Sequence, residues 1–396
     1  MTYEEVIEQS RIELGKIVES GTSAIGFFYP HAPYELILAH GFVPTLLRTD
    51  TNVTGAYETS LQTFACSLTR NIYSQRETAQ LPELAGIVFP GNTCDSLQNL
   101  GDIWRIRFPE DNVFRLTYPV ADYGMGSKKF LIEELKLLSQ GLNDVLGHPF
   151  SDEEFRKAIK FMKSFRESAQ ALYAARLLNP KLISYSSLAS LVRGFLHVPS
   201  QAALDRIITA SENIIDESDL EEEIKDLRKA ILSREFNAIE LPSNLSSPRI
   251  AILGGMSEPE AIVRIFEMLP QETESVIALD ILSFGFKTVF TKSPEGDDPY
   301  EALAGSILSS PGEPTQEGLQ SRVKYQVDLI KHLNIDGLII CEQSFCDPDE
   351  FEAPSLVKAI NDLGLPAVRL PLDSELSDLS RLGVRVQSFL ETLDHS

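Results

Sequence analysis

Cysteine is scarce in this chain, which has 4 cysteines among 396 residues. Such a low content excludes a small secreted scaffold held by disulfides, whose cysteines are much denser. The sequence also contains no CxxC pair, which excludes the compact zinc motifs. Thiols that stay reduced are available as ligands, as nucleophiles or as small buried groups. The cysteines are Cys66, Cys94, Cys341 and Cys346.

Long apolar runs are absent as well. The apolar runs that occur, such as 338–341, are far shorter than the roughly 20 residues that a membrane-spanning helix needs. The first residues, 1–5, carry neither the basic flank nor the apolar core of a signal peptide. The sequence therefore predicts a cytoplasmic protein without a membrane segment.

Positive charge is in short supply. The chain has 35 Lys and Arg against 58 Asp and Glu, which gives a formal net charge of -23. A protein with this charge is repelled by nucleic acid backbones and by anionic membranes, so we expect neither as a partner. A solvated acidic surface explains the charge, and docking to a basic protein is the alternative.

The familiar nucleotide and hydrolase motifs are also missing. The sequence has no P-loop, no GxGxxG, no GxSxG and no HExxH, and its 6 histidines are not clustered. Any ATP that the function requires would therefore be used by a partner protein.

What the chain does contain is two stretches in which short apolar runs alternate with amphipathic segments. This alternation is typical of an α/β fold, with a parallel sheet covered by helices. Between the stretches, 151–235 has helical periodicity without strand signals, and it starts with the capping-box pattern Ser151-x-x-Glu154. We predict an N-terminal α/β domain over 1–148, a helical segment over 149–240 and a C-terminal α/β domain over 249–396.

The predicted elements follow from these patterns. The expected strands are 24–28, 43–47, 84–89, 113–117, 250–253, 276–279, 337–340 and 367–370. The expected helices are 34–40, 96–106, 127–145, 315–333, 354–363 and 377–393, with a further helix capped by Ser257.

Two cysteines occupy matching positions in the two α/β stretches. Cys94 follows the strand 84–89 and Cys346 follows the strand 337–340, where ligands of open α/β sheets gather. Cys66 begins another predicted helix, and a helix N-terminus favours a thiolate. Three thiolates suit an iron–sulfur cluster or zinc. The alternative is that these cysteines are only small buried hydrophobes.

Other candidates carry less weight. Cys341 could be a fourth ligand, or it could be a buried thiol of its strand. Asp95 and Asp347, next to two of the cysteines, are expected to cap helices. Weak catalytic candidates are Glu35 and Tyr34, together with the nearby His31; each could face a cleft or serve only on a helix surface.

The cysteine contexts resemble a known family. PGNTCDS at 90–96 and FCDPDEFEAP at 345–354 are similar to the cysteine motifs of the 2-hydroxyacyl-CoA dehydratase D-component and benzoyl-CoA reductase family. The likeness covers nearly the whole chain, and Phe-Cys-Asp-Pro is its most specific piece. Further similar segments are 33–37, 41–44, 364–366 and 385–391.

The resemblance implies a cofactor, partners and a reaction. In this family three cysteines hold a 4Fe-4S cluster in the cleft between two α/β domains; by motif position these are Cys66, Cys94 and Cys346. It also implies an anaerobic heterodimer with a homologous second subunit, and an ATP-dependent iron–sulfur activator protein that delivers one electron. The acyl-CoA substrate then becomes a ketyl radical, which loses a β-hydroxyl, as in a lyase, or is reduced.

Two alternatives stay open beside an enzyme subunit of this kind. The chain could be a non-catalytic electron-relay or scaffold subunit of such a complex, for which ligation by four cysteines would argue. It could also be a zinc-holding binding protein with little redox activity.

Overall fold

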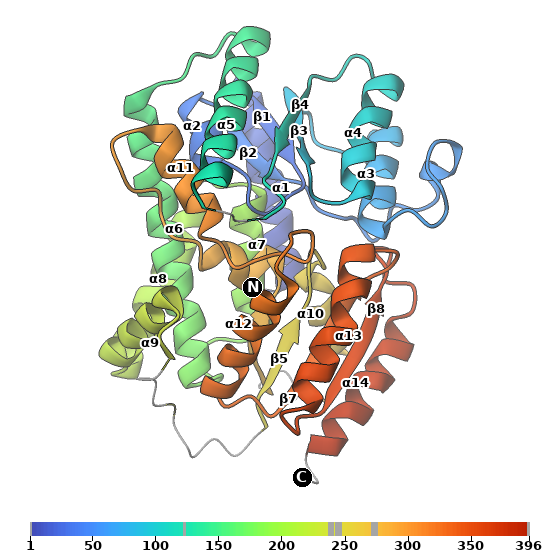
Figure 1. Ribbon diagram of the computed structural model, residues 1–396, viewed down its shortest axis with the longest axis vertical. Coiled ribbons are helices and arrows are strands. Elements are labelled where there is room, and N and C mark those ends of the chain that lie inside the picture. The colour runs from blue at the N-terminus through green and yellow to red at the C-terminus, as the bar shows by residue number, and fades with distance from the viewer. Residues whose placement is uncertain (1, 122–123, 237–240, 242–247, 271–275, 394–396) are drawn as a thin grey trace.

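Two parallel sheets form the centres of the two halves of the chain (Figure 1). The computed structural model describes residues 2–121, 124–236, 241, 248–270 and 276–393. The strand orders are β2-β1-β3-β4 and β6-β5-β7-β8, so the second sheet repeats the topology of the first. The predicted α/β fold with two parallel-sheet domains is therefore confirmed. The strands are β1 Ala24–Phe27, β2 Val43–Leu46, β3 Gly86–Gly91, β4 Val113–Thr117, β5 Ile250–Leu253, β6 Ile277–Ile281, β7 Gly337–Gln343 and β8 Ala367–Leu372.

Helices cover both sheets and fill the space between the two stretches of strands (Figure 1). They are α1 Tyr3–Glu19, α2 Tyr34–Ala39, η1 Ala56–Thr59, α3 Ser67–Glu77, α4 Asp95–Arg107, α5 Met125–Leu146, α6 Asp152–Leu178, α7 Tyr185–His197, α8 Gln201–Ser218, α9 Glu221–Ser233, α10 Pro259–Glu267, η4 Ser283–Lys287, α11 Pro299–Leu308, α12 Leu319–His332, α13 Asp347–Asn361 and α14 Leu379–Leu393.

Most strands are apolar because helices cover both faces of the sheets. Every residue of β3, β5, β6 and β7 is buried, as expected for parallel strands inside an α/β layer structure. The edge strand β8 alternates between buried and more exposed residues over most of its length. Successive side chains of a strand point to opposite faces of the sheet, so each strand contributes to the core on both sides of its sheet.

The helical segment in the middle of the chain contains α6 to α9, as its periodicity predicts. The Ser151 hydroxyl accepts a hydrogen bond from the Glu154 N–H and so caps α6. The long helix α6 packs against α2 of the first half and against β6 of the second, so it runs beside both sheets (Figure 1).

Some helix starts differ from the prediction. α12 begins at Leu319 and not at 315, because Gly318 has a φ of +90° that no helical residue adopts. α13 already begins at Asp347, with Pro348 in its first turn, and continues past Pro354. The predicted cap at Ser257 is wrong, because Glu258 is the N-cap of α10.

The predicted domain boundaries stay a prediction. Tyr3 and Ile7 of α1 belong to the hydrophobic cluster that includes Ile250 and Ile339 of the second sheet, so the first helix packs beyond its own half. Across the part of the chain that the structure describes, none of the helices has the length and apolar character that crossing a bilayer requires.

Candidate functional site

Three of the cysteines occupy the N-cap positions of three helices. Cys66 precedes α3, Cys94 precedes α4 and Cys346 precedes α13. Asp95 and Asp347 were expected to be the caps, and this expectation is wrong, because both lie in the first helical turn. The position places each thiol beside backbone N–H groups that have no partner within the helix.

The sheet topology brings two of these thiols to equivalent places. Cys94 follows β3 and Cys346 follows β7, and each of these strands is third in order along its own sheet. The order of the strands reverses between β1 and β3 and between β5 and β7, and open α/β sheets bind ligands at such reversals. The two sheets therefore contribute the same type of position to one site.

Cys66, Cys94 and Cys346 line one cavity of about 380 Å³, which we call the cysteine cavity. Its wall includes residues that follow strands of both sheets. This volume is more than ten times the roughly 30 Å³ that one water molecule occupies in the liquid. The other lining residues are Thr93, Asp95, Ser96, Leu97, Met256, Pro314, Thr315, Leu319, Arg322, Asp347, Pro348, Phe351 and Glu352.

The turn before Cys346 fixes the N-terminus of α3 against the second sheet. The Ser67 N–H donates to the Ser344 carbonyl at 3.1 Å. The side-chain amide of Gln343, the last residue of β7, donates to the Ser67 and Ser374 hydroxyls. Phe345 adopts a φ of 59°, which is rare for a bulky side chain. Together these contacts hold Cys66 beside Cys346.

The three thiols have different protonation tendencies. A hydrogen bond with Cys346 lowers the pKa of Cys66, with help from the Leu68 and Thr69 N–H groups, while the same bond and burial raise the pKa of Cys346. Burial raises the pKa of Cys94 to about 12 against the opposing backbone hydrogen bonds. The pKa of Cys66 is therefore lowered chiefly by Cys346 and only in part by the helix N-terminus, and at Cys94 burial outweighs the helix N-terminus.

Cys341 lies outside the cysteine cavity. It is within β7, not at its end, and its side chain is 1% exposed. Ile339, two residues earlier on the same face, belongs to the same hydrophobic cluster, whereas Cys66 and Cys346 belong to another. Burial raises the pKa of the Cys341 thiol well above its usual range.

The weak catalytic candidates Glu35 and Tyr34 do not line the cysteine cavity. The carboxylate of Glu35 forms a buried ion pair with Arg166 at 2.8 Å. The Tyr34 hydroxyl donates to the Leu196 carbonyl at 3.2 Å, and burial raises its pKa far above the usual range. Both side chains therefore bind structural partners and do not face the cysteine cavity.

His31 belongs to a buried charged network behind the cavity wall. Its Nε2 lies 3.1 Å from Oε1 of Glu313, whose other oxygen accepts hydrogen bonds from Ser283 at 2.6 Å and from Lys287 at 3.0 Å. Pro314 and Thr315, which line the cavity, follow Glu313 directly. No sequence pattern marked Lys287 or Glu313, because they lie in different segments that meet only in the folded chain.

Sequence reasoning also missed the ion pair in the cavity wall. The guanidinium of Arg322 in α12 donates to Oε2 of Glu352 in α13 at 2.7 Å and to the carbonyl of Glu317 at 2.8 Å. Both side chains are more than nine-tenths buried. The pair therefore fixes the position of α13 relative to α12 beside Cys346. Arg322 lies on a predicted helix, but Glu352 lies before the predicted helix 354–363, so the pair had no sequence signal.

The donor set fits an iron–sulfur cluster better than a single ion. Within the described ranges, no three His, Cys, Asp or Glu side chains are grouped so that they could hold a metal ion. A 4Fe-4S cluster uses soft thiolate ligands on different irons, so its ligands surround a cage and not a point. Three thiols around a cavity of about 380 Å³ fit that requirement.

The fold and the cysteine cavity define a class of two-domain α/β proteins with thiols at the ends of strands from both sheets. The family described as 2-hydroxyglutaryl-CoA dehydratase, D-component, matches residues 30–393. The chain belongs to this family, as the cysteine contexts indicate.

Several relatives align over almost their whole length. The (R)-phenyllactyl-CoA dehydratase beta subunit of Clostridium sporogenes is 24% identical, over 99% of this chain and 97% of the relative. The beta subunit of (R)-2-hydroxyglutaryl-CoA dehydratase from Acidaminococcus fermentans is 20% identical, over 99% and 98%. A benzoyl-CoA reductase subunit of Thauera aromatica is 19% identical, over 96% and 92%.

Proposed function

We propose that this chain is a subunit of a 2-hydroxyacyl-CoA dehydratase or of an aromatic acyl-CoA reductase, and that Cys66, Cys94 and Cys346 hold a 4Fe-4S cluster in the cysteine cavity. The observation that carries the proposal is that these three helix N-caps, drawn from both halves of the fold, line one cavity. The names of the relatives support the enzyme class.

A bound cluster would supply single electrons, which in such enzymes convert an acyl-CoA thioester to a ketyl radical. The chain's own residues would hold and surround it. Backbone N–H groups at the N-termini of α3, α4 and α13 donate to the Cys66, Cys94 and Cys346 thiols, and they would stabilise negative charge on the bound thiolates. The Arg322–Glu352 pair and the Lys287–Glu313 pair keep the wall fixed.

The proposal assigns three protein ligands and leaves Cys341 out. With three thiolates, the chain would leave one iron of the cluster without a protein ligand. The burial of Cys341 in the apolar core of the second half supports this choice.

Metal analysis after anaerobic purification tests the cluster. We expect about four irons and four sulfides per chain in the full-length protein. Cys94→Ser and Cys346→Ser should lose most of the iron, because each variant removes a thiolate ligand. Cys341→Ala is the matched control, since it deletes a buried thiol outside the cavity, and its iron content should equal that of the wild type. Iron retained by Cys94→Ser, or iron lost by Cys341→Ala alone, would contradict the assignment.

The partners are proposed from the same family. The relatives are named as subunits, which supports a homologous second subunit. The electron would come from an ATP-dependent activator protein. This sequence has no P-loop, so the ATP would be used by that partner. We expect the chain to copurify with a second protein of the same family.

Spectroscopy separates a catalytic role from an electron relay. If this chain binds substrate at its cluster, an acyl-CoA thioester should change the electron paramagnetic resonance spectrum of the reduced protein. An unchanged spectrum in the assembled complex would favour the relay or scaffold role. Zinc in place of iron in the metal analysis would instead support the zinc-holding alternative.

A further inference from the structure

The side chain of Gln343, the last residue of β7, connects the two halves of the chain next to the cysteine cavity. The residue is 5% exposed. Its amide donates to the hydroxyl of Ser67 in α3 and, at 3.0 Å, to the hydroxyl of Ser374, which follows β8. Ser374 in turn donates to Ser67 at 3.3 Å, and both serines are buried. An amide of the second half therefore holds the helix of the first half whose N-cap is Cys66.

The backbone of Gln343 fixes Cys346 at the same time. The Gln343 carbonyl accepts from the Cys346 N–H at 2.9 Å. The Gln343 N–H donates to Oδ2 of Asp349, in the first turn of α13, at 3.2 Å. The Asp349 carboxylate lies directly against Gly255, because a Cβ added to that glycine would overlap one of the carboxylate oxygens. Gln343 thus contacts the helix of one cysteine through its side chain and the turn of another through its backbone.

Arg70, one turn further along α3, provides a second connection to the other half. Its guanidinium donates to Oδ2 of Asp373 at 3.2 Å and lies over the Phe345 ring at 5.4 Å from the centroid. The Asp373 side chain is 32% exposed, so water weakens this ion pair. The hydrogen bonds of Gln343 are buried, where the loss of a partner costs more. Gln343 is therefore the buried part of the connection between α3 and the turn before Cys346.

We propose that Gln343 is a positioning residue for the thiols. Its amide holds Cys66 against Cys346 and so preorganises two of the three cluster ligands before any iron binds. Groups that are already in place lose less freedom on binding, so a ligand that needs both sulfurs should bind less tightly when the amide is absent. This role rests on the proposed cluster site, whereas the pairing of the two thiols can be measured without a cluster.

Phenylarsine oxide measures the pairing in the full chain stripped of iron by a chelator. One arsenic bonds two thiol sulfurs and releases water, so tight binding requires two sulfurs close together. The background variant is Cys94→Ser, which leaves Cys66 and Cys346 as the thiols of the cavity, while Cys341 is buried in the core. We expect this background to bind the arsenical tightly. Adding Gln343→Met, which keeps the side-chain length but removes the amide, should weaken binding at least about fivefold, the effect of roughly one lost hydrogen bond.

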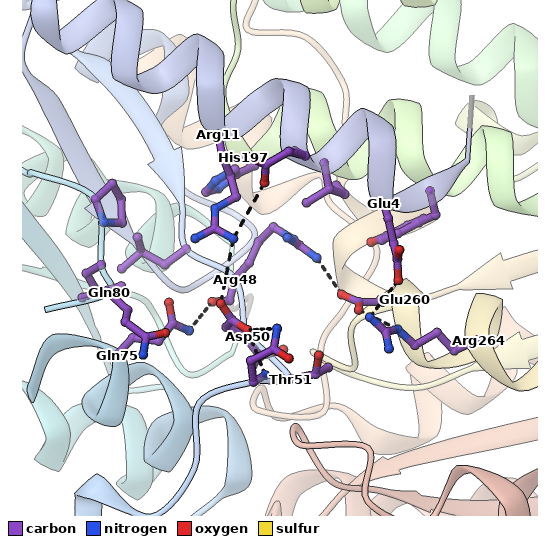
Figure 2. Close-up of a pocket in the computed structure, with 18 residues that line it drawn as sticks. Glu4, Arg11, Arg48, Asp50, Thr51, Gln75, Gln80, His197, Glu260 and Arg264 are labelled. Atoms are coloured by element: carbon purple, nitrogen blue, oxygen red, sulfur yellow. Dashed lines mark hydrogen bonds and ion pairs between the residues drawn. The ribbon is translucent and has the colours of Figure 1, made fainter. Parts of the chain in front are cut away.

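Gln75→Met in the same background is the matched control. Gln75 also belongs to α3 and is 6% exposed, and its amide donates two hydrogen bonds, to the Arg48 carbonyl at 2.7 Å and to Asn71 at 2.9 Å. It lines a different cavity (Figure 2). Both variants should lose stability in urea unfolding, because each loses buried hydrogen bonds. Only Gln343→Met should weaken arsenical binding.

Two serine variants keep the test decisive if Gln343→Met does not fold. Ser67→Ala removes the hydroxyl on α3 that accepts from Gln343, so it should weaken arsenical binding as Gln343→Met does. Ser374→Ala removes a hydroxyl of the second half and leaves the bond between Gln343 and Ser67, so its effect should be smaller. In protein that holds a cluster, Gln343→Met should release iron to a chelator faster than Gln75→Met.

Two results would overturn the positioning role, whether or not the protein holds iron. One is unchanged arsenical affinity in Gln343→Met or, where that variant does not fold, in Ser67→Ala. The other is equal weakening by Gln75→Met, which would show a general loss of stability. If the wild type contains no iron but Gln343→Met still loses arsenical affinity, the result contradicts the proposed cluster and supports the positioning of the thiols by Gln343.

Discussion

Cys94 occupies the N-cap of α4, where two backbone N–H groups and the helix dipole favour a thiolate. Burial has the larger effect and raises its pKa to about 12. His197 ends α7, where a helix C-terminus would favour the charged ring, but burial and nearby arginines lower its pKa and keep it neutral. At the scale of single residues, the protonation state follows the surroundings in space more than the position along a helix.

The depressed pKa of His197 predicts an acid-dependent loss of stability. The pKa of a histidine in an unfolded chain is about 6.5, whereas in the folded protein burial lowers the pKa of His197 to about 3. Between these values the unfolded state binds one more proton, so His197 should reduce the free energy of unfolding by roughly 1.4 kcal/mol for each pH unit of acidification.

Urea unfolding from pH 6.5 to 4.5 measures this slope. In His197→Asn the slope should be shallower than in the wild type by roughly that amount, whatever the change in stability at pH 7. His332→Asn is the comparison variant, since His332 ends α12, whereas the arginines that lower the pKa of His197 belong to α1, to α7 and to the segment after β2. Identical slopes in His197→Asn and the wild type would contradict the prediction.

At the scale of helices and strands, apolar periodicity predicted the types of the elements. It did not always predict the residue at which a helix begins. The buried runs of β5 and β7 predicted their strands because a parallel strand is apolar on both faces. The helix start predicted at 354 is wrong, because α13 already begins at Asp347 with Pro348 in its first turn and continues through Pro354.

The cap of α6 gives a prediction at this scale. The Ser151 hydroxyl accepts from the Glu154 N–H at 3.3 Å. Ser151→Ala should therefore lower the free energy of unfolding by about 1 kcal/mol. Ser164→Ala, in the middle of the same helix, should be neutral or slightly stabilising, because alanine is the better helix former there. Urea denaturation of both variants checks the expectation, and equal effects would exclude a capping role for Ser151.

At the scale of the whole molecule, buried ion pairs join the two halves. Arg193 of α7 contacts both carboxylate oxygens of Glu258 at 2.8 Å and donates to the Leu47 carbonyl at 2.9 Å. Leu47 follows β2 of the first sheet, and Glu258 caps α10 beside the second. One side chain from the helical middle segment therefore connects elements of both sheets.

Removal of this connection should be costly. Arg193→Met leaves the carboxylate of Glu258 buried without its main partner, so we expect a loss of roughly 3–5 kcal/mol in the free energy of unfolding. Lys358→Met removes half of an exposed ion pair with Asp362 and should change the stability little. Urea unfolding of both variants provides the comparison. A small effect of Arg193→Met would show that the halves are held together by other contacts.

The sequence by itself determined the two α/β stretches, the helical segment between them and the position of Cys94 and Cys346 after a strand. These features are local, since they depend on the spacing of apolar residues and on turns. The family resemblance grouped Cys66 with Cys94 and Cys346, but only the tertiary structure places the three thiols at one cavity and buries Cys341 in the core. Such contacts depend on how the sheets and helices pack, and residues far apart in the chain carry no local signal of that packing.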